Sequence, residues 1–277
     1  MPTNKRARQK SARRVKLEAQ RRAAKRQALI RRGVVIAIAA ALIIGSVLLF
    51  TAVGNSPTTT TTSTSSTTST TTTIVKPGAQ AAIDKIAKDH GCPQSPSTGA
   101  NSLQYTAYPK MTINPHIYYY AHIITTAGPI ELQLNPMIAP LAVNNFVFLA
   151  NHNFYNCNTF HRVIQSFMAQ TGDPVQNGSG GPGYSFKDEL PKTATPQYPI
   201  YSVAMANSGP NTNGSQFFIV GGPGGESLSP NYTLFGKLIN GFGVFQSIMN
   251  GGHPSTNGGE GATLYQRMLT VSVSTTK

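Results

Sequence analysis

The feature that most constrains this chain is an uncharged apolar run near its N-terminus. Residues 33–53, from Gly33 to Val53, contain no charged side chain and consist mostly of Ile, Val, Leu and Ala. As a helix the run is about 31 Å long, which matches a bilayer hydrocarbon core of about 30 Å. A helix packed on a globular core would show a polar face, and this run shows none. The sequence therefore predicts one transmembrane helix at residues 33–53.

The charge of the chain is concentrated before this run. Residues 1–32 hold thirteen Lys or Arg and one Glu, so they carry +12 of the formal net charge of +14. Such a segment marks the cytoplasmic side of a span and can contact anionic lipid headgroups. Read alone it would also suit nucleic acid, but the span would confine it to the membrane surface, so no nucleic-acid partner is expected. A cleaved signal peptide is the alternative, with Ala52-Val53-Gly54 as a poor cleavage site.

The rest of the chain divides by composition. Residues 54–76 are almost pure Thr and Ser and predict a disordered linker, because they have little apolar surface to bury. Residues 77–117 predict a short helix at Ala79–His90 followed by an irregular extension. Residues 118–277 predict the main domain. On this topology residues 1–32 are cytoplasmic and the main domain lies outside the cell.

Residues 118–277 have a mainly β pattern with two helices. Apolar residues alternate around Tyr120 and again at Ile130, Leu132 and Leu134, which predicts a hairpin with these three side chains in the core. The stripe at Val143, Phe146, Val147 and Ala150 predicts a helix over Pro140–Ala150. Further strands are predicted at Ser202–Ala206, Gln216–Val220, Tyr232–Leu238 and Tyr265–Ser274, with a second helix at Phe242–Asn250.

Two stretches of the domain carry unusual polar residues. Thr159–Gln170 reads Thr-Phe-His-Arg-Val-Ile-Gln-Ser-Phe-Met-Ala-Gln, and as one strand it would place Arg162, Met168 and Gln170 on one face. Ser202–Val220 places a polar turn, Asn207–Gly214, between two β-rich runs. A lone Arg in such a setting is most often a surface residue whose stem covers apolar neighbours.

Together these stretches resemble the cyclophilins, the peptidyl-prolyl cis-trans isomerases. The resemblance rests on Phe160-His-Arg-Val-Ile, Phe167-Met-Ala-Gln and Met205-Ala-Asn-Ser-Gly-Pro-Asn-Thr-Asn-Gly-Ser-Gln-Phe-Phe218, and it covers roughly Tyr118 to Ser274. It implies a closed, eight-stranded antiparallel β-barrel capped by two helices, with an exposed groove. It also implies rotation of X-Pro bonds in polypeptides, without cofactor or metal, by a protein that we expect to be a monomer. A chaperone or proline-peptide binding module with little isomerase activity is the alternative.

The resemblance also implies roles for single residues. Arg162 corresponds to the catalytic arginine. Eight further positions correspond to residues of the substrate groove, and two positions near them differ from the family. Phe167, Met168, Phe218 and Leu228 are expected to wall the proline pocket, Gln170 and Gln216 to orient Arg162 or the peptide, and Ala206 and Asn207 to hold the extended substrate. Tyr232 stands where many eukaryotic members have a groove His, and Ser227 where they have a Trp. Since an indole is missing at Ser227, we expect weak binding of the cyclic peptide cyclosporin.

Three further signals bear on chemistry. Cys92 and Cys157 would lie in an oxidising compartment and could form a disulfide, with two free thiols as the alternative. Gly178–Gly183 matches G-x-G-x-x-G literally, but no helix start follows it, so a groove-edge loop is the better interpretation. The His and Cys residues show no metal-ligand spacing. The sequence therefore predicts a membrane-anchored bacterial isomerase on the outer face of a Gram-positive-type cell, acting on secreted or cell-surface polypeptides.

Overall fold

The computed structural model describes residues 78–93, 99–191, 197–253 and 263–277. The predicted basic segment, membrane span and Thr/Ser linker, residues 1–76, lie outside the described residues. Within the described ranges, no helix combines the length and apolar character needed to cross a membrane. These ranges comprise the main domain and the extension that precedes it.

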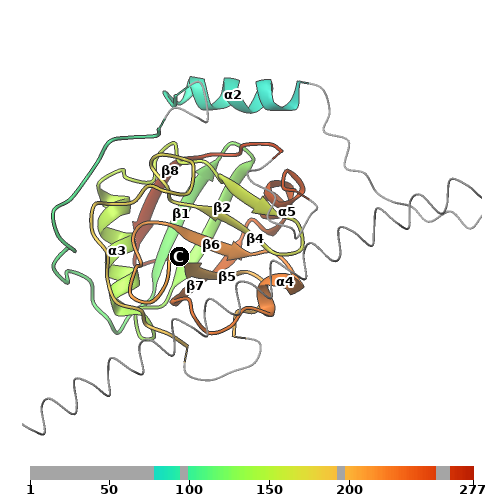
Figure 1. The fold of residues 1–277 in the computed structure, drawn as a ribbon. Helices are drawn as coiled ribbons and strands as arrows, with labels where there is room; N and C mark the ends of the chain where they lie inside the picture. The colour runs from blue at the N-terminus through green and yellow to red at the C-terminus, as the bar shows by residue number, and fades with distance from the viewer. Residues whose placement is uncertain (1–77, 94–98, 192–196, 254–262) are drawn as a thin grey trace, which may run out of the picture. The chain divides into compact units, whose positions relative to one another are not determined.

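Eight strands form one antiparallel sheet in the order β3-β4-β6-β5-β7-β2-β1-β8 (Figure 1). The sheet joins residues from 119 to 274, so its neighbours in space are often distant in sequence. The strands are β1 Tyr119–Thr125, β2 Gly128–Leu134, β3 Arg162–Ile164, β4 Met168–Thr171, β5 Ser202–Met205, β6 Phe217–Val220, β7 Leu234–Asn240 and β8 Met268–Ser274.

The sheet is an open, curled half-barrel, which corrects the closed barrel that the resemblance implied. The edge strands β3 and β8 share no ladder, and a single bridge between Thr159 and Arg267 brings their ends together. Two backbone hydrogen bonds support this bridge, from Phe160 N to Gln266 O at 2.8 Å and from Met268 N to Asn158 O at 2.8 Å. The physical reason is that β3 is only three residues long, because the chain turns at once into β4.

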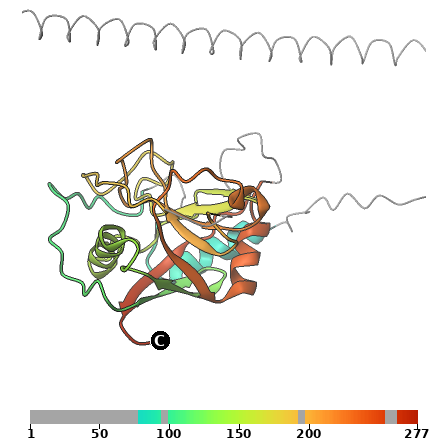
Figure 2. The ribbon, with the colours of Figure 1, turned by 90° about the horizontal axis from the view of Figure 1, so that it is seen from below.

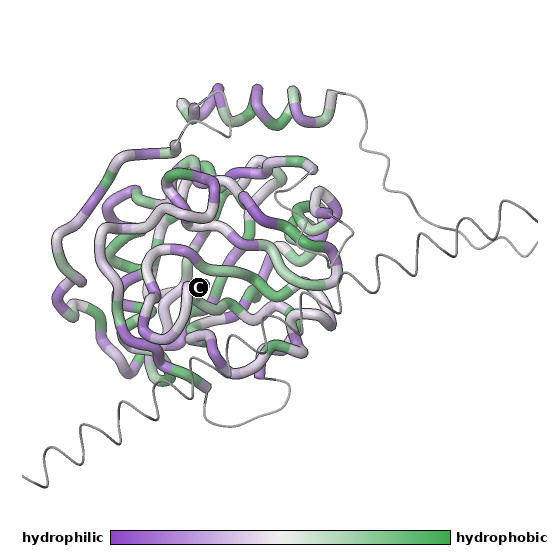
Figure 3. The backbone as a smooth tube through the Cα atoms, viewed as in Figure 1, coloured by the Kyte–Doolittle hydropathy of each residue, from purple (hydrophilic) through white to green (hydrophobic). Residues whose placement is uncertain are grey.

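The core fills the concave side of the sheet and extends under two helices, α3 (Pro140–Asn151) and α5 (Phe242–Asn250), which lie at opposite sides of the strands (Figure 2). The predicted bounds agree with these to within one residue. Hydrophobic residues gather along the strands (Figure 3). Ile130, Leu132 and Leu134 are buried, as the alternating pattern predicted. A four-residue helix, α4 (Pro223–Glu226), was not predicted because its sequence, Pro-Gly-Gly-Glu, has poor helix propensity.

Helix α3 begins where its backbone donors meet a carboxylate. Pro140 occupies the first turn, where its missing N–H costs nothing. The next two amides, of Leu141 and Ala142, donate to the two carboxylate oxygens of Glu189, each at 2.9 Å. These bonds satisfy donors that a helix start leaves unpaired. Glu189 therefore has a structural role, and burial, partly offset by these two bonds, raises its pKa.

The helix that precedes the irregular extension packs against the start of β8. Helix α2 (Ala79–Asp89), predicted one residue longer, buries Ile83 and Ala87. Asp84 lies 3.7 Å from the buried guanidinium of Arg267. A disulfide joins Cys92 to Cys157, which is the pairing that the sequence left open. Residues 99–117 contain no helix or strand, as predicted, and run along the surface of the domain.

Candidate active site

A small cavity lies beside the hairpin that β3 and β4 form. Its volume is about 160 Å³. Nine of the predicted site residues line it: Arg162, Phe167, Met168, Gln170, Ala206, Asn207, Phe218, Leu228 and Tyr232. The tenth, Gln216, lines a larger hollow that adjoins the cavity. The structure thus brings together residues that are as many as 70 positions apart in sequence.

Sheet register explains how the side chains converge. In the hairpin, Arg162 pairs with Gln170 and Ile164 pairs with Met168, and β6 then places Phe218 opposite Gln170. Directly paired residues project from the same face of a sheet, so guanidinium, amide and aromatic ring share one surface. The single strand considered for Thr159–Gln170 is therefore two strands with a turn at Ser166, whose φ is +60°. The hairpin keeps Arg162 and Gln170 on one face because they are cross-strand partners.

The wall of the cavity formed by Phe167, Met168, Phe218, Leu228 and Tyr232 is apolar and well packed. Met168 and Phe218 are only 2% and 4% exposed, while Phe167 and Leu228 are half-buried. The ring of Tyr232 meets that of Phe218 edge to face at 5.4 Å between centroids. Such a contact fixes both rings beyond what their burial contributes. The cavity therefore has the character of a preformed site for a small apolar ring.

Tyr198 holds Tyr232 in place, a role that no sequence signal indicated. Its hydroxyl accepts from Tyr232 N at 2.9 Å and donates to Tyr232 O at 2.8 Å. This double contact clamps the backbone at the cavity wall. Burial raises the pKa of Tyr198, so the phenol stays protonated and keeps its donor. Tyr198 lies in a loop far from either motif, which is why no local pattern singled it out.

Arg162 lies at the rim of the cavity with its charge unneutralised. Its Nη1 is 3.4 Å from Gln170 Oε1, and its Cζ is 5.8 Å from the centroid of the Phe167 ring. Within the described ranges no carboxylate forms an ion pair with it. Burial lowers the pKa of Arg162, an effect that Tyr232 opposes, but a guanidinium stays protonated at neutral pH. The site thus presents a fixed cation with free donors beside an apolar wall.

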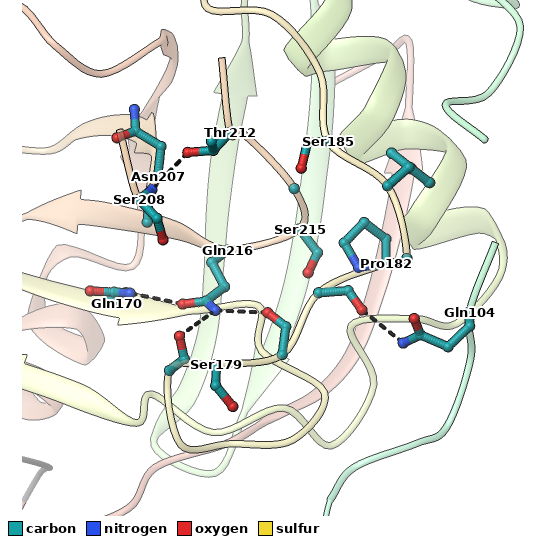
Figure 4. Close-up of a pocket in the computed structure, with 17 residues that line it drawn as sticks. Gln104, Gln170, Ser179, Pro182, Ser185, Asn207, Ser208, Thr212, Ser215 and Gln216 are labelled. Atoms are coloured by element: carbon teal, nitrogen blue, oxygen red, sulfur yellow. Dashed lines mark hydrogen bonds between the residues drawn. The ribbon is translucent and has the colours of Figure 1, made fainter. Parts of the chain in front are cut away.

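A relay of amides sets the orientation of Arg162, and Figure 4 shows two of its members, Gln170 and Gln216. Gln216 donates from Nε2 to the carbonyls of Gly178 and Gly180, at 3.0 and 2.8 Å. Its oxygen must then face Gln170, whose Nε2 donates to it at 2.9 Å. The oxygen of Gln170 in turn faces Arg162. Because each amide has one donor end and one acceptor end, the two glycine carbonyls fix the direction of the whole relay.

The glycine loop, residues 178–183, can lie close to Asp173 because it has glycine where a side chain would not fit. A Cβ at Gly180 would lie 2.1 Å from Asp173 Oδ1, so a larger residue cannot fit. Asp173 is fully buried and accepts from the backbone amides of Val175, Asn177 and Gly178. Asp173 is therefore a turn-forming residue, and the loop is the groove edge that the sequence suggested.

A short stretch of backbone at Ala206 and Asn207 borders both the cavity and the larger hollow. Ala206 donates from its amide to Gln216 O at 2.9 Å, which continues the sheet beyond β5. At the next residue, Asn207, neither the backbone amide nor the carbonyl is paired within the part of the chain that the structure describes. The Asn207 side chain is held by Asn231 O at 2.9 Å. An extended peptide can therefore hydrogen-bond here as an added strand.

Comparison with known proteins decides the family. The model of the cyclophilin type peptidyl-prolyl cis-trans isomerase/CLD family matches residues 120–271, more than half of the chain. The chain is a member of the cyclophilin family. The match confirms the resemblance and begins two residues inside the predicted domain of residues 118–277.

Curated relatives and solved structures are cyclophilins as well. Peptidyl-prolyl cis-trans isomerase B of Streptomyces anulatus is 44% identical over 135 residues, which is 43% of this chain and 75% of the relative. The probable isomerase B of Mycobacterium leprae is 41% identical over 146 residues, 48% of this chain and 49% of that protein. A cyclophilin of Cryptosporidium parvum, solved in the presence of the dipeptide Ala-Pro, matches with a TM-score of 0.50 at 31% identity, covering 56% of this chain and 98% of its own. Several relatives are longer proteins, of whose length the match covers 20 to 22%.

Two other polar residues of this cyclophilin are set apart from the cavity. His161 is buried, and both of its ring nitrogens lack a hydrogen-bond partner in the described structure. Burial lowers its pKa, and Asp173 opposes this effect. Ser227, the position at which the sequence was expected to lack an indole, is exposed and donates to Pro223 O at 3.0 Å. In the ranges described, no group of three or more His, Cys, Asp or Glu could hold a metal ion.

Proposed function

We propose that this cyclophilin accelerates the cis–trans rotation of X-Pro bonds in polypeptides, with Arg162 stabilising the twisted amide. The observation that carries the proposal is the guanidinium of Arg162 at the rim of an apolar cavity, oriented by Gln170 and free of any carboxylate among the described residues. The Cryptosporidium parvum relative solved in the presence of Ala-Pro agrees with this choice of ligand.

The chemistry requires no proton transfer and no covalent intermediate. Rotation breaks amide resonance and crosses a barrier of about 18–20 kcal/mol, so uncatalysed exchange takes about 10–100 s. In the twisted state the prolyl nitrogen becomes pyramidal, and its lone pair, no longer delocalised into the carbonyl, can accept a hydrogen bond. An enzyme accelerates the step by binding this state more tightly than either planar state. A fixed, positively charged donor at the nitrogen does this.

The residues divide this work. Met168, Phe218 and Tyr232 hold the pyrrolidine ring, so one side of the bond is anchored while the other turns. The free backbone of Asn207 pairs with the extended peptide. Arg162 then donates to the prolyl nitrogen as it pyramidalises. An Arg suits this role better than a Lys, because its planar donors keep the direction that the Gln170–Gln216 relay sets.

We place this activity at the outer face of a membrane. The uncharged run at residues 33–53, with its basic N-terminal flank, supports a single-pass anchor with the N-terminus in the cytoplasm. The disulfide between Cys92 and Cys157 supports an oxidising compartment for the domain. Substrates would then be secreted or cell-surface polypeptides whose folding waits on proline isomerisation. We expect the protein to act as a monomer, without cofactor.

The proposal is tested by the rate of cis-to-trans conversion of a short X-Pro peptide. The full-length chain, kept in mild detergent, is compared with Arg162→Ala. Loss of a single transition-state donor is expected to lower kcat/KM by about 100- to 1,000-fold. Lys237→Ala removes the same charge from an exposed site on β7 and should leave the rate unchanged. Equal rates for Arg162→Ala and wild type, with peptide binding kept, would favour the binding-module alternative.

A further inference from the structure

The larger hollow beside the proline cavity has a wall from outside the family region. This hollow has a volume of about 1,050 Å³ and shares Gln170, Ala206 and Asn207 with the cavity. A peptide whose proline fills the cavity therefore extends into the hollow along Ala206 and Asn207. Gln104 also lines the hollow, although it precedes the family match at residues 120–271. The extension thus contributes a side chain to the substrate-binding face.

Gln104 is held in place by the glycine loop. Its Nε2 donates to Gly181 O at 2.9 Å (Figure 4). The neighbouring Tyr105 N donates to Pro182 O at 2.8 Å. A Cβ at Gly183 would lie 2.6 Å from Tyr105 O, and the φ of Gly183 is +93°. The loop therefore needs glycine here to let the extension approach so closely.

The extension is also anchored on both sides of Gln104. Asn101 donates from Nδ2 to Phe154 O at 2.8 Å. The Tyr105 ring packs edge to face on Phe148, with centroids 5.0 Å apart. Upstream, the Cys92–Cys157 disulfide ties the chain to the segment that precedes β3. A side chain on so fixed a segment loses little conformational entropy when a substrate contacts it.

The lining of the hollow has one chemical character. Of the described residues that form it, none carries a charge, and ten have a hydroxyl or amide side chain, among them Gln104, Ser179, Ser208 and Thr212. A charged side chain that contacts these residues would give up part of its water and find no counter-charge among them. An uncharged polar side chain could exchange its hydrogen bonds with water for bonds to these groups.

We propose that Gln104 is a specificity-determining residue, which selects polypeptides with an uncharged polar residue close to the proline. The inference rests on the proposed function, because it takes the adjoining cavity as the proline site. It assigns to the extension, residues 99–117, a direct part in substrate choice.

The test is a change of preference on charge substitution. Host peptides keep one Pro and carry Gln, Lys or Glu at each of the three positions on either side in turn. For the full-length chain and for Gln104→Glu, kcat/KM is measured for each peptide. Gln104→Glu is expected to raise the ratio of Lys to Gln peptides by about two- to fivefold, the effect of one partly exposed ion pair, at one or two adjacent positions. Gln104→Lys should raise the ratio of Glu to Gln peptides at the same positions.

The matched control is Gln246→Glu, which makes the same charge change on the exposed face of α5. Its ratios should equal those of wild type. A uniform fall in kcat/KM for all peptides in both Gln104 variants, with ratios unchanged, would show a merely structural role and overturn the inference while leaving the proposed function intact. If the wild-type chain lacks isomerase activity, the proposed function fails. The same ratios are then read from peptide dissociation constants, where a missing change in preference also overturns the inference.

Discussion

Asp84 on α2 should stabilise the protein far more than the surface ion pair on the same helix. Asp84 Oδ1 lies 3.7 Å from Arg267 Nη2, whose side chain is 0% exposed, while the side chain of Asp84 is 29% exposed. Within the described ranges, no hydrogen bond reaches any guanidinium nitrogen of Arg267. Asp84 is therefore its counter-charge, and Asp84→Asn leaves a buried cation unneutralised while keeping the oxygen that accepts from Gln80.

The expected magnitude follows from distance and burial. At an effective dielectric constant of about 20, two unit charges 3.7 Å apart attract by about 4 kcal/mol. Water reaches Asp84, which weakens the attraction, so we expect Asp84→Asn to lower the free energy of unfolding by about 2–3 kcal/mol. With a urea m-value of about 2–3 kcal/mol/M, the unfolding midpoint should fall by about 1 M.

The assay is urea unfolding of the full-length chain, followed by tyrosine fluorescence because the sequence has no Trp. The control is Asp89→Asn, which breaks the shorter pair between Lys85 and Asp89 at 2.8 Å. Those side chains are 75% and 55% exposed, so no shift of the midpoint is expected. The double variant Asp84→Asn/Arg267→Met should recover much of the loss, since it removes the buried cation as well. A midpoint shift for Asp84→Asn no larger than that for Asp89→Asn would refute the reasoning from burial.

Three further outcomes are expected. Replacing Cys92 and Cys157 by Ala should lower the free energy of unfolding by about 4 kcal/mol, because the disulfide closes a loop with a sequence separation of 65; an unchanged urea midpoint contradicts this. Burial lowers the pKa of His161 below its unfolded value of about 6.5. Its contribution to stability is therefore complete above a pH of about 6.5 and is lost as the pH falls through the folded pKa. His161→Gln should make the free energy of unfolding depend less on pH below about 6.5, and an unchanged pH profile argues against this. Cyclosporin should inhibit the wild-type chain weakly because Ser227 offers no indole, and nanomolar inhibition would disprove this.

The ten assigned site residues lie close together although the sheet that carries them differs from the predicted barrel. Most of them belong to two uninterrupted motifs, and nine of the ten line one cavity, while their roles stay predictions. The single strand considered for Thr159–Gln170 is a hairpin, yet Arg162 and Gln170 still lie on one face of the sheet. They do so because they are paired directly across the two strands.

What could not be predicted depends on contacts between distant segments. Whether β3 and β8 pair is decided by strand length and curl, which leave a single bridge at Thr159 and Arg267. The clamp of Tyr198 on Tyr232 and the wall formed by Gln104 come from loops without a repeating pattern. The ion pair of Asp84 with Arg267 joins residues 183 positions apart, and neither residue is unusual in its local sequence.

The most direct test of the central claim separates binding from rotation. Exchange NMR at a saturating concentration of an X-Pro peptide gives the rate of cis–trans interconversion on the full-length enzyme, and titration of the same sample gives its affinity. Arg162→Lys keeps the charge but loses the planar donors that the Gln170–Gln216 relay orients. We predict that the rate on the enzyme falls by about 10- to 100-fold while the affinity changes by less than about threefold. Wild-type exchange rates in Arg162→Lys and in Arg162→Ala, at unchanged affinity, would contradict the account.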